Sequence, residues 1–193
     1  MLGTGRLSKG ATLMENEVAH RLVQVLTEKK LTIGFAESLT GGLLADALIS
    51  VPGASAVMRG SLVTYATDTK TSVLQVDPAL IAVNSVIDPL VATQMATGAL
   101  AALNCDIAIS TTGVAGPTPQ DGHPVGEVYI GFAQLPPLDL FDERETLALS
   151  LGVLAKVDPE NCRSNIRRAT VRAALALVLE RLDPQDAPPS HDA

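Results

Sequence analysis

The chain has 193 residues, of which 47% are hydrophobic and 18% are charged, a balance typical of a globular protein with a buried core. Its net charge of −7 and its aromatic content of 3% argue against a large nucleic-acid interface, which would need clustered Lys and Arg. No segment has the length of a membrane span or the apolar region of a signal peptide. We therefore expect a cytoplasmic protein that binds neither nucleic acid nor membrane.

The sequence predicts one domain. We expect a disordered arm over residues 1–13, a single domain over residues 14–182 and a disordered tail over residues 183–193. The predicted elements are, in chain order, a helix at 15–29, a strand at 31–36, a helix at about 40–50, a strand at 61–67, short helical turns near 69–82, a helix at 88–103, strands at 105–111 and 127–135, a hairpin partner at 144–153 and a helix at about 159–181. The strands at 31–36 and 105–111 are almost wholly apolar, as in a largely parallel sheet covered on both faces.

The stretch AESLTGG, residues 36–42, joins the first strand to a helix. Ser38 would lie at the carboxyl end of a parallel strand and beside a helix N-terminus, where free N–H groups can stabilise an oxyanion. Gly41 and Gly42 would then give a substrate room to approach the backbone. The alternative interpretation is that Ser38 or Thr40 only caps the helix and that the glycines allow close packing of strand and helix.

The second strand is followed by Tyr65 and Lys70. Carboxyl ends of neighbouring parallel strands open into one crevice, so these side chains should approach Ser38. The histidines at 20, 123 and 191 are not placed for a catalytic triad with Ser38, which leaves a lysine with a lowered pKa as its activator, directly or through a tyrosine hydroxyl. The alternative is that Lys70 is an ordinary solvated surface residue.

The third strand ends in a glycine-rich loop that runs from Thr112 to Gly116. Its backbone could form an anion-binding nest facing the same crevice. The alternative is a simple connection between two strands.

The two cysteines, Cys105 and Cys162, form no CxxC motif and have no paired histidines nearby in the sequence. This pattern predicts reduced thiols and no zinc site. The sequence therefore indicates chemistry that needs neither a metal nor a cofactor.

Four segments, in order along the chain, resemble the C-terminal domain of the competence-damage-inducible protein CinA and its stand-alone relatives, the nicotinamide mononucleotide (NMN) amidohydrolases. The segment AESLTGG is similar to the family's AESCTGG, VPGASAVMRGSLVTYATDTKTSVLQV to PGSSxxFxGGxVTYSNEAKxxLLGV, TTGVAGP to SGIAGP, and HPVGEVYIGF to KPVGTVYIGF. The likeness extends from about residue 15 to residue 181. Among the departures, Leu39 replaces cysteine and His123 replaces lysine.

The resemblance implies a three-layer α/β/α sandwich with a mixed, largely parallel sheet of about five strands. It also implies hydrolysis of NMN to nicotinic acid mononucleotide and ammonia, and we expect a homo-oligomer. Ser38 would be the nucleophile, with Tyr65 and Lys70 in its activating network. The residues that would contact the substrate are Glu37, Thr40, Gly41, Gly42, Thr112, Gly113, Gly116 and Arg163. The alternative is a catalytically weakened nucleotide-binding or regulatory module of the same family.

Overall fold

The computed structural model describes residues 6–136, 138 and 145–183. Residues 184–193 of the predicted tail and the first five residues of the predicted arm lie outside these ranges. In chain order the elements are α1 (Arg6–Lys29), β1 (Ile33–Glu37), α2 (Leu43–Ile49), the 3₁₀ helix η1 (Ala54–Ala56), β2 (Met58–Val63), α3 (Thr67–Leu74), α4 (Pro78–Asn84), α5 (Pro89–Leu103), β3 (Ile107–Gly113), β4 (Glu127–Gln134), β5 (Thr146–Ser150), α6 (Gly152–Val157) and α7 (Cys162–Leu182).

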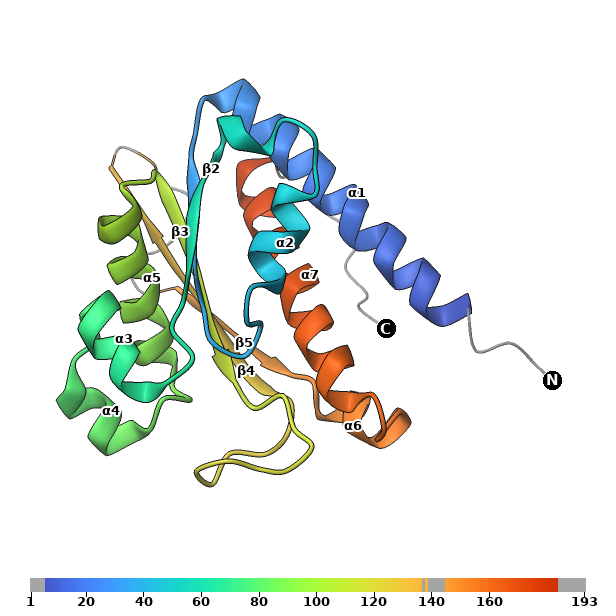
Figure 1. Cartoon of the computed structure of the whole chain (residues 1–193), viewed down its shortest axis with the longest axis vertical. Helices are drawn as coiled ribbons and strands as arrows, with labels where there is room; N and C mark the ends of the chain where they lie inside the picture. The colour runs from blue at the N-terminus through green and yellow to red at the C-terminus, as the bar shows by residue number, and fades with distance from the viewer. Residues whose placement is uncertain (1–5, 137, 139–144, 184–193) are drawn as a thin grey trace.

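The sheet has five strands in the order β2-β1-β3-β4-β5. Strands β2, β1 and β3 are parallel, whereas β4 and β5 add antiparallel partners at one side. Helices α1, α2 and α7 cover one face, and α3, α4 and α5 cover the other (Figure 1). The predicted three-layer fold with a mixed sheet is therefore confirmed, with its parallel half formed by β2, β1 and β3.

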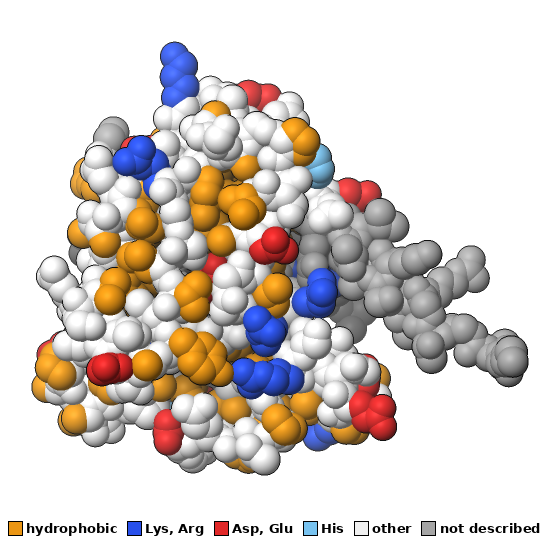
Figure 2. Space-filling model, viewed as in Figure 1, with side chains coloured by type: hydrophobic (Ala, Val, Ile, Leu, Met, Phe, Trp, Pro, Cys, Tyr) orange, Lys and Arg blue, Asp and Glu red, His pale blue; other side chains and the backbone are white. Residues whose placement is uncertain are grey.

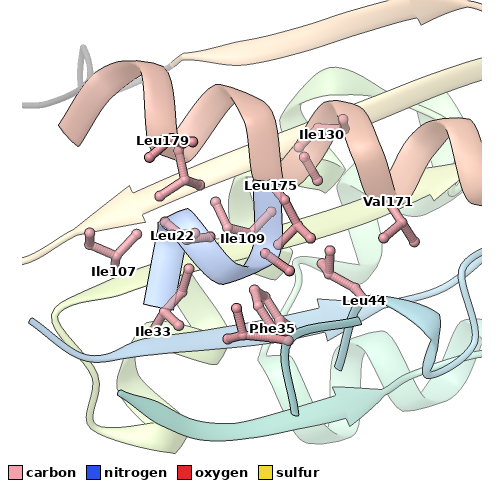
Figure 3. Close-up of a cluster of buried hydrophobic side chains, with 14 of the residues drawn as sticks. Leu22, Ile33, Phe35, Leu44, Ile107, Ile109, Ile130, Val171, Leu175 and Leu179 are labelled. Carbon is pink, nitrogen blue, oxygen red and sulfur yellow. The ribbon is translucent and has the colours of Figure 1, made fainter. Parts of the chain in front are cut away.

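The larger core lies between the sheet and the layer of α1 and α7. Its side chains come from both helices and from β1, β3 and β4, as Leu22, Phe35, Ile109 and Leu175 illustrate (Figure 3). Every residue of β1 is buried, which explains why its sequence is a continuous apolar run ending in a single glutamate. Full burial of one such apolar side chain contributes about 1.5–3 kcal/mol, so this layer holds the interior strand β1 in place.

On the other face, α5 packs against β1, β3 and β4 and supports α3. The helix begins where the Asp88 carboxylate accepts hydrogen bonds from the N–H groups of Leu90 and Val91, a normal N-cap followed by a proline in the first turn. Gly98 lets α3 come close, because a Cβ at this position would overlap the Leu74 carbonyl. This contact fixes α3, which carries Lys70.

Three elements differ from the sequence prediction. Helix α1 begins at Arg6 instead of near residue 15, so part of the expected arm is helical; the segment contains several good helix formers, such as Leu, Lys, Ala and Met. The short helix α6 was not expected. Strand β2 is shifted toward the N-terminus and ends at Val63, because the chain must turn there to start α3 at Thr67.

None of the described helices combines the length and the apolar character that crossing a membrane requires.

Candidate active site

A pocket of about 300 Å³ lies at the carboxyl ends of the three parallel strands, which is the lower edge of the sheet in Figure 1. This volume is at the small end of the range for small-molecule sites. The walls are formed by Ser38, Leu39, Tyr65, Thr67, Lys70, Val86, Ile87, Thr112, Gly113, Val114, Ala115, Gly116, Thr118, Pro119, Gln120 and Arg163. Segments that are far apart in the sequence therefore meet where the strand ends were expected to converge.

Ser38 and Lys70 are in direct contact at the base of this pocket. The Lys70 Nζ atom lies 3.1 Å from Ser38 Oγ and 2.8 Å from the Thr64 carbonyl oxygen. The lysine side chain is buried, with only 1% of the residue exposed. Ser38 itself is partly exposed, so a ligand in the pocket could reach its hydroxyl.

Burial lowers the pKa of Lys70 to about 8. Its partners are a hydroxyl and the carbonyls of Thr64 and Tyr65, and no carboxylate among the described residues bonds to it to hold its proton. An amine with this pKa is partly neutral near pH 7 and can accept a proton from a neighbouring hydroxyl. The pair has the contacts that activation of a serine by a lysine requires.

The Tyr65 hydroxyl bonds to Arg163 and not to Lys70 or Ser38, where the sequence analysis expected it. The residue is 61% exposed, and its hydroxyl accepts a hydrogen bond of 3.0 Å from Arg163. Only the Tyr65 main-chain carbonyl meets Lys70, at 3.4 Å. Lys70 therefore contacts Ser38 without an intervening tyrosine hydroxyl.

Glu37 was expected to contact substrate, but it is fully buried and is not part of the pocket wall. Its carboxylate accepts hydrogen bonds from the N–H groups of Gly42, Leu44 and Ala45 and from the Ser61 hydroxyl. These N–H groups belong to the first turn of α2, where a negative charge is stabilised by the helix dipole. Glu37 thus holds the turn that carries Ser38, and neither Ser38 nor Thr40 caps the helix.

Thr40, Gly41 and Gly42 also lie outside the pocket wall. The Thr40 hydroxyl bonds to the Thr111 hydroxyl at 2.8 Å. The two glycines have φ values of 57° and 95°, a region that other residues rarely adopt. Glycine at both positions is therefore favoured by the backbone of the turn.

Arg167, on α7, fixes the same turn from the opposite side. Its guanidinium donates to the carbonyls of Leu39 and Thr40 at 2.9 and 2.7 Å. The turn's N–H groups from Gly42 to Ala45 are taken by Glu37 and by the Thr40 carbonyl. The N–H groups of Leu39, Thr40 and Gly41 have no acceptor within the described chain. Leu39 follows Ser38 directly and lies in the pocket wall. Its N–H is therefore the free donor nearest in sequence to Ser38 for a ligand in the pocket.

Four other predicted residues, Thr112, Gly113, Gly116 and Arg163, lie in the pocket wall. The Thr112 hydroxyl donates to the Val86 carbonyl, which ties the end of β3 to the segment before α5. Arg163 donates to the Gly116 carbonyl at 2.9 Å as well as to Tyr65. It therefore joins two sides of the pocket across its mouth.

Sequence reasoning missed several wall residues, among them Leu39, Val86 and Gln120, and also the role of Arg167. Leu39 lies within the quoted segment AESLTGG and Gln120 lies in the loop between TTGVAGP and HPVGEVYIGF, but Val86 follows a helix end that carries no chemical signal. Arg167 lies four residues after Arg163 and thus on the same side of α7, which was an available signal. Figure 2 shows Lys and Arg side chains gathered over this part of α7.

Cys105 and Cys162 are both free and buried. Burial raises the pKa of the Cys105 thiol to about 11, so this thiol is unreactive near neutral pH. Across the described side chains, no group of His, Cys, Asp and Glu residues is arranged to hold a metal ion.

Comparison with known proteins shows one family throughout. The family model of the CinA C-terminal domain matches residues 15–182. A CinA-like protein of Frankia casuarinae is 44% identical over 132 residues, which are 68% of this chain and 30% of that protein. Another, from Chlorobaculum tepidum, is 46% identical over 58% of this chain and 27% of that protein. The chain thus spans about a third of the length of the curated relatives it matches.

Solved structures show the same relationship. The competence/damage inducible protein CihA of Agrobacterium tumefaciens is 32% identical with a TM-score of 0.75, over 87% of this chain and 95% of that one. A CinA superfamily protein of Escherichia coli is 28% identical with a TM-score of 0.74, over 86% of this chain and 89% of that one. By sequence and by structure, the chain belongs to the CinA C-terminal domain family.

Proposed function

We propose that the protein hydrolyses the carboxamide of NMN, with Ser38 as the nucleophile and Lys70 as its general base. The observation that carries this proposal is the contact of 3.1 Å between Lys70 Nζ and Ser38 Oγ, made by a buried lysine whose pKa is lowered to about 8. Burying a lysine costs desolvation energy and lowers its pKa. Shifted pKa values of this kind cluster at catalytic sites.

In this mechanism Ser38 Oγ attacks the carboxamide carbon while its proton moves to Lys70 Nζ. The proton then passes to the leaving nitrogen, and ammonia departs from an acyl-enzyme. Water attacks the acyl carbon and gives a proton to Lys70. That proton passes to Ser38 Oγ as the acyl bond breaks, and nicotinic acid mononucleotide is released. The N–H of Leu39, a residue of the pocket wall, is the proposed donor to the oxyanion, since no acceptor in the described chain occupies it.

The charge of the pocket supports an anionic substrate. Its wall contains two cationic side chains, Lys70 and Arg163, and no acidic one. Arg163 lies at the mouth and is exposed, so it could exchange a protein contact for a phosphate. A guanidinium suits this role because it can donate two parallel hydrogen bonds to one phosphate group.

The test is ammonia release from NMN by the purified protein and by the variants Ser38→Ala and Lys70→Met. Exposed residues of the same kind provide the controls Ser72→Ala and Lys29→Met. We expect each site variant to lose at least about 100-fold in turnover and each control to keep wild-type turnover. Wild-type turnover in Ser38→Ala would overturn the nucleophile. NMN binding by calorimetry without any product would favour the binding or regulatory module instead.

A further inference from the structure

A second serine has a histidine and a carboxylate in line with it. The Ser85 Oγ atom lies 3.2 Å from His123 Nε2, and His123 Nδ1 lies 2.8 Å from Glu127 Oε1. Ser85 directly follows α4, His123 lies in the loop between β3 and β4, and Glu127 begins β4. None of the three side chains is part of the wall of the Ser38 pocket, so they form a separate cluster.

The hydrogen bonds of Glu127 determine where the protons of this cluster lie. Its Oε1 accepts the Tyr129 hydroxyl at 2.8 Å as well as His123. Burial alone would raise the pKa of Glu127, but the hydrogen bonds from Tyr129 and His123 outweigh burial and lower it. An ionised carboxylate only accepts, so the neutral imidazole carries its proton on Nδ1 and leaves Nε2 free to accept the Ser85 hydroxyl.

The backbone of Ser85 is also unusual. Its φ of 71° and ψ of 178° are sparsely populated by residues other than glycine, and such conformations gather at functional sites. The Ile87 N–H donates to Ser85 Oγ at 3.1 Å, which occupies one lone pair of the hydroxyl and orients it. The hydroxyl proton can therefore be directed at His123.

We propose that Ser85, His123 and Glu127 form a second nucleophilic centre that reacts with small activated esters. Ser85 and His123 are partly exposed, so the centre suits a small acyl group with a good leaving alcohol. Ser85 Oγ attacks the ester carbonyl while its proton moves to His123 Nε2. The bond to the alcohol breaks, and the alcohol takes that proton. Water then attacks the acyl-serine, its proton passes through Nε2 to Ser85 Oγ, and the carboxylic acid leaves.

A fluorophosphonate probe tests this centre, because a serine with a working base displaces its fluoride to form an Oγ–P bond. The parent protein for the experiment is Ser38→Ala, which removes labelling at the other site. Three site variants are made in this parent: Ser85→Gly, His123→Gln and Glu127→Gln. Glycine is chosen at position 85 because it accepts the positive φ and lacks the hydroxyl. Ser72→Ala in the same parent is the matched control. Mass spectrometry of the digested protein locates the label, and p-nitrophenyl acetate hydrolysis gives a second rate.

We expect the label on the peptide that contains Ser85 in the parent and in the Ser72→Ala control. Ser85→Gly should lose it, and His123→Gln should slow both labelling and ester hydrolysis at least about 100-fold. Melting temperatures show whether each variant is folded. If His123→Gln unfolds, Glu127→Gln takes its place, and we expect its rates of labelling and ester hydrolysis to fall at least tenfold. An unlabelled Ser85, or a His123→Gln rate within threefold of the parent, would overturn the proposal. Either result leaves NMN hydrolysis at Ser38 untouched.

Discussion

The Arg163 guanidinium donates a hydrogen bond of 3.0 Å to the Tyr65 hydroxyl and thereby bridges the mouth of the Ser38 pocket. The same guanidinium donates to the Gly116 carbonyl. The bridge separates two roles that the sequence could not separate: the tyrosine hydroxyl bonds to the arginine, and Lys70 bonds to Ser38 directly.

Replacing Tyr65 by phenylalanine removes only the hydroxyl. Because Lys70 reaches Ser38 directly, we expect kcat for NMN to stay within about threefold of wild type, whereas Lys70→Met loses at least about 100-fold. Steady-state ammonia release from both variants provides the comparison. A loss in Tyr65→Phe as large as that in Lys70→Met would show that the hydroxyl takes part in proton transfer.

Replacing Arg163 by glutamine should affect substrates according to whether they carry a phosphate. Loss of a charge-assisted hydrogen bond costs about 1.5–3 kcal/mol, so we expect KM for NMN to rise about 10- to 150-fold. Nicotinamide riboside, which lacks the phosphate, should show little change in KM. The exposed Arg168 on the same helix provides the control Arg168→Gln. An equal effect on both substrates would mean that Arg163 acts on the shape of the pocket and not on the phosphate.

The pH profile of turnover should follow the Lys70 amine. With a pKa of about 8, roughly one tenth of the amine is neutral at pH 7 and about half at pH 8. The neutral form is the base, so kcat should rise about fivefold from pH 7 to pH 8 and level off above pH 9. Initial rates at saturating NMN measure this rise. A flat profile between pH 7 and pH 9 would contradict the assignment of Lys70 as the base.

The free energy of unfolding should depend on pH in a way that reflects the lowered pKa of Lys70. The pKa of Lys70 is about 8 in the folded chain against 10.5 as its ordinary value, so between these pH values the unfolded chain binds more protons and stability rises with pH. Relative to Lys70→Met, the free energy of unfolding of the wild type should increase by about 3 kcal/mol from pH 7 to pH 10.5. Urea denaturation at several pH values measures this difference, since other titrating groups cancel between the two proteins. A difference that stays constant with pH would contradict the lowered pKa.

The meeting of Ser38 and Lys70 was predictable, because strand ends of a parallel sheet converge whatever the details of packing. The role of Glu37 was not, since a glutamate at a strand end looks the same in sequence whether it faces a ligand or folds back on the next helix. Arg167 contacts Leu39 across 128 positions of sequence, and such a contact depends on the packing of α7 over α2. The sequence therefore predicted which strand ends line the pocket but could not tell wall residues from the residues that support the wall.

Replacing Glu37 by glutamine tests this supporting role. The buried carboxylate accepts three backbone N–H groups and the Ser61 hydroxyl, and a neutral amide has only one oxygen to offer them. We expect a loss of about 2–4 kcal/mol in the free energy of unfolding, measured by urea denaturation. Turnover of NMN by the folded variant should fall as well, because the turn that carries Ser38 loses its anchor.

Asp46→Asn is the matched control, since it removes the same charge from the exposed side of α2. There the exposed carboxylate lies in the first turn of the helix, where the helix dipole contributes about 0.3–1 kcal/mol. If Glu37→Gln costs no more than Asp46→Asn, the hydrogen bonds of Glu37 do not hold the turn. If Glu37→Gln instead keeps its stability but raises KM for NMN, the carboxylate faces the substrate in solution, as the sequence first suggested.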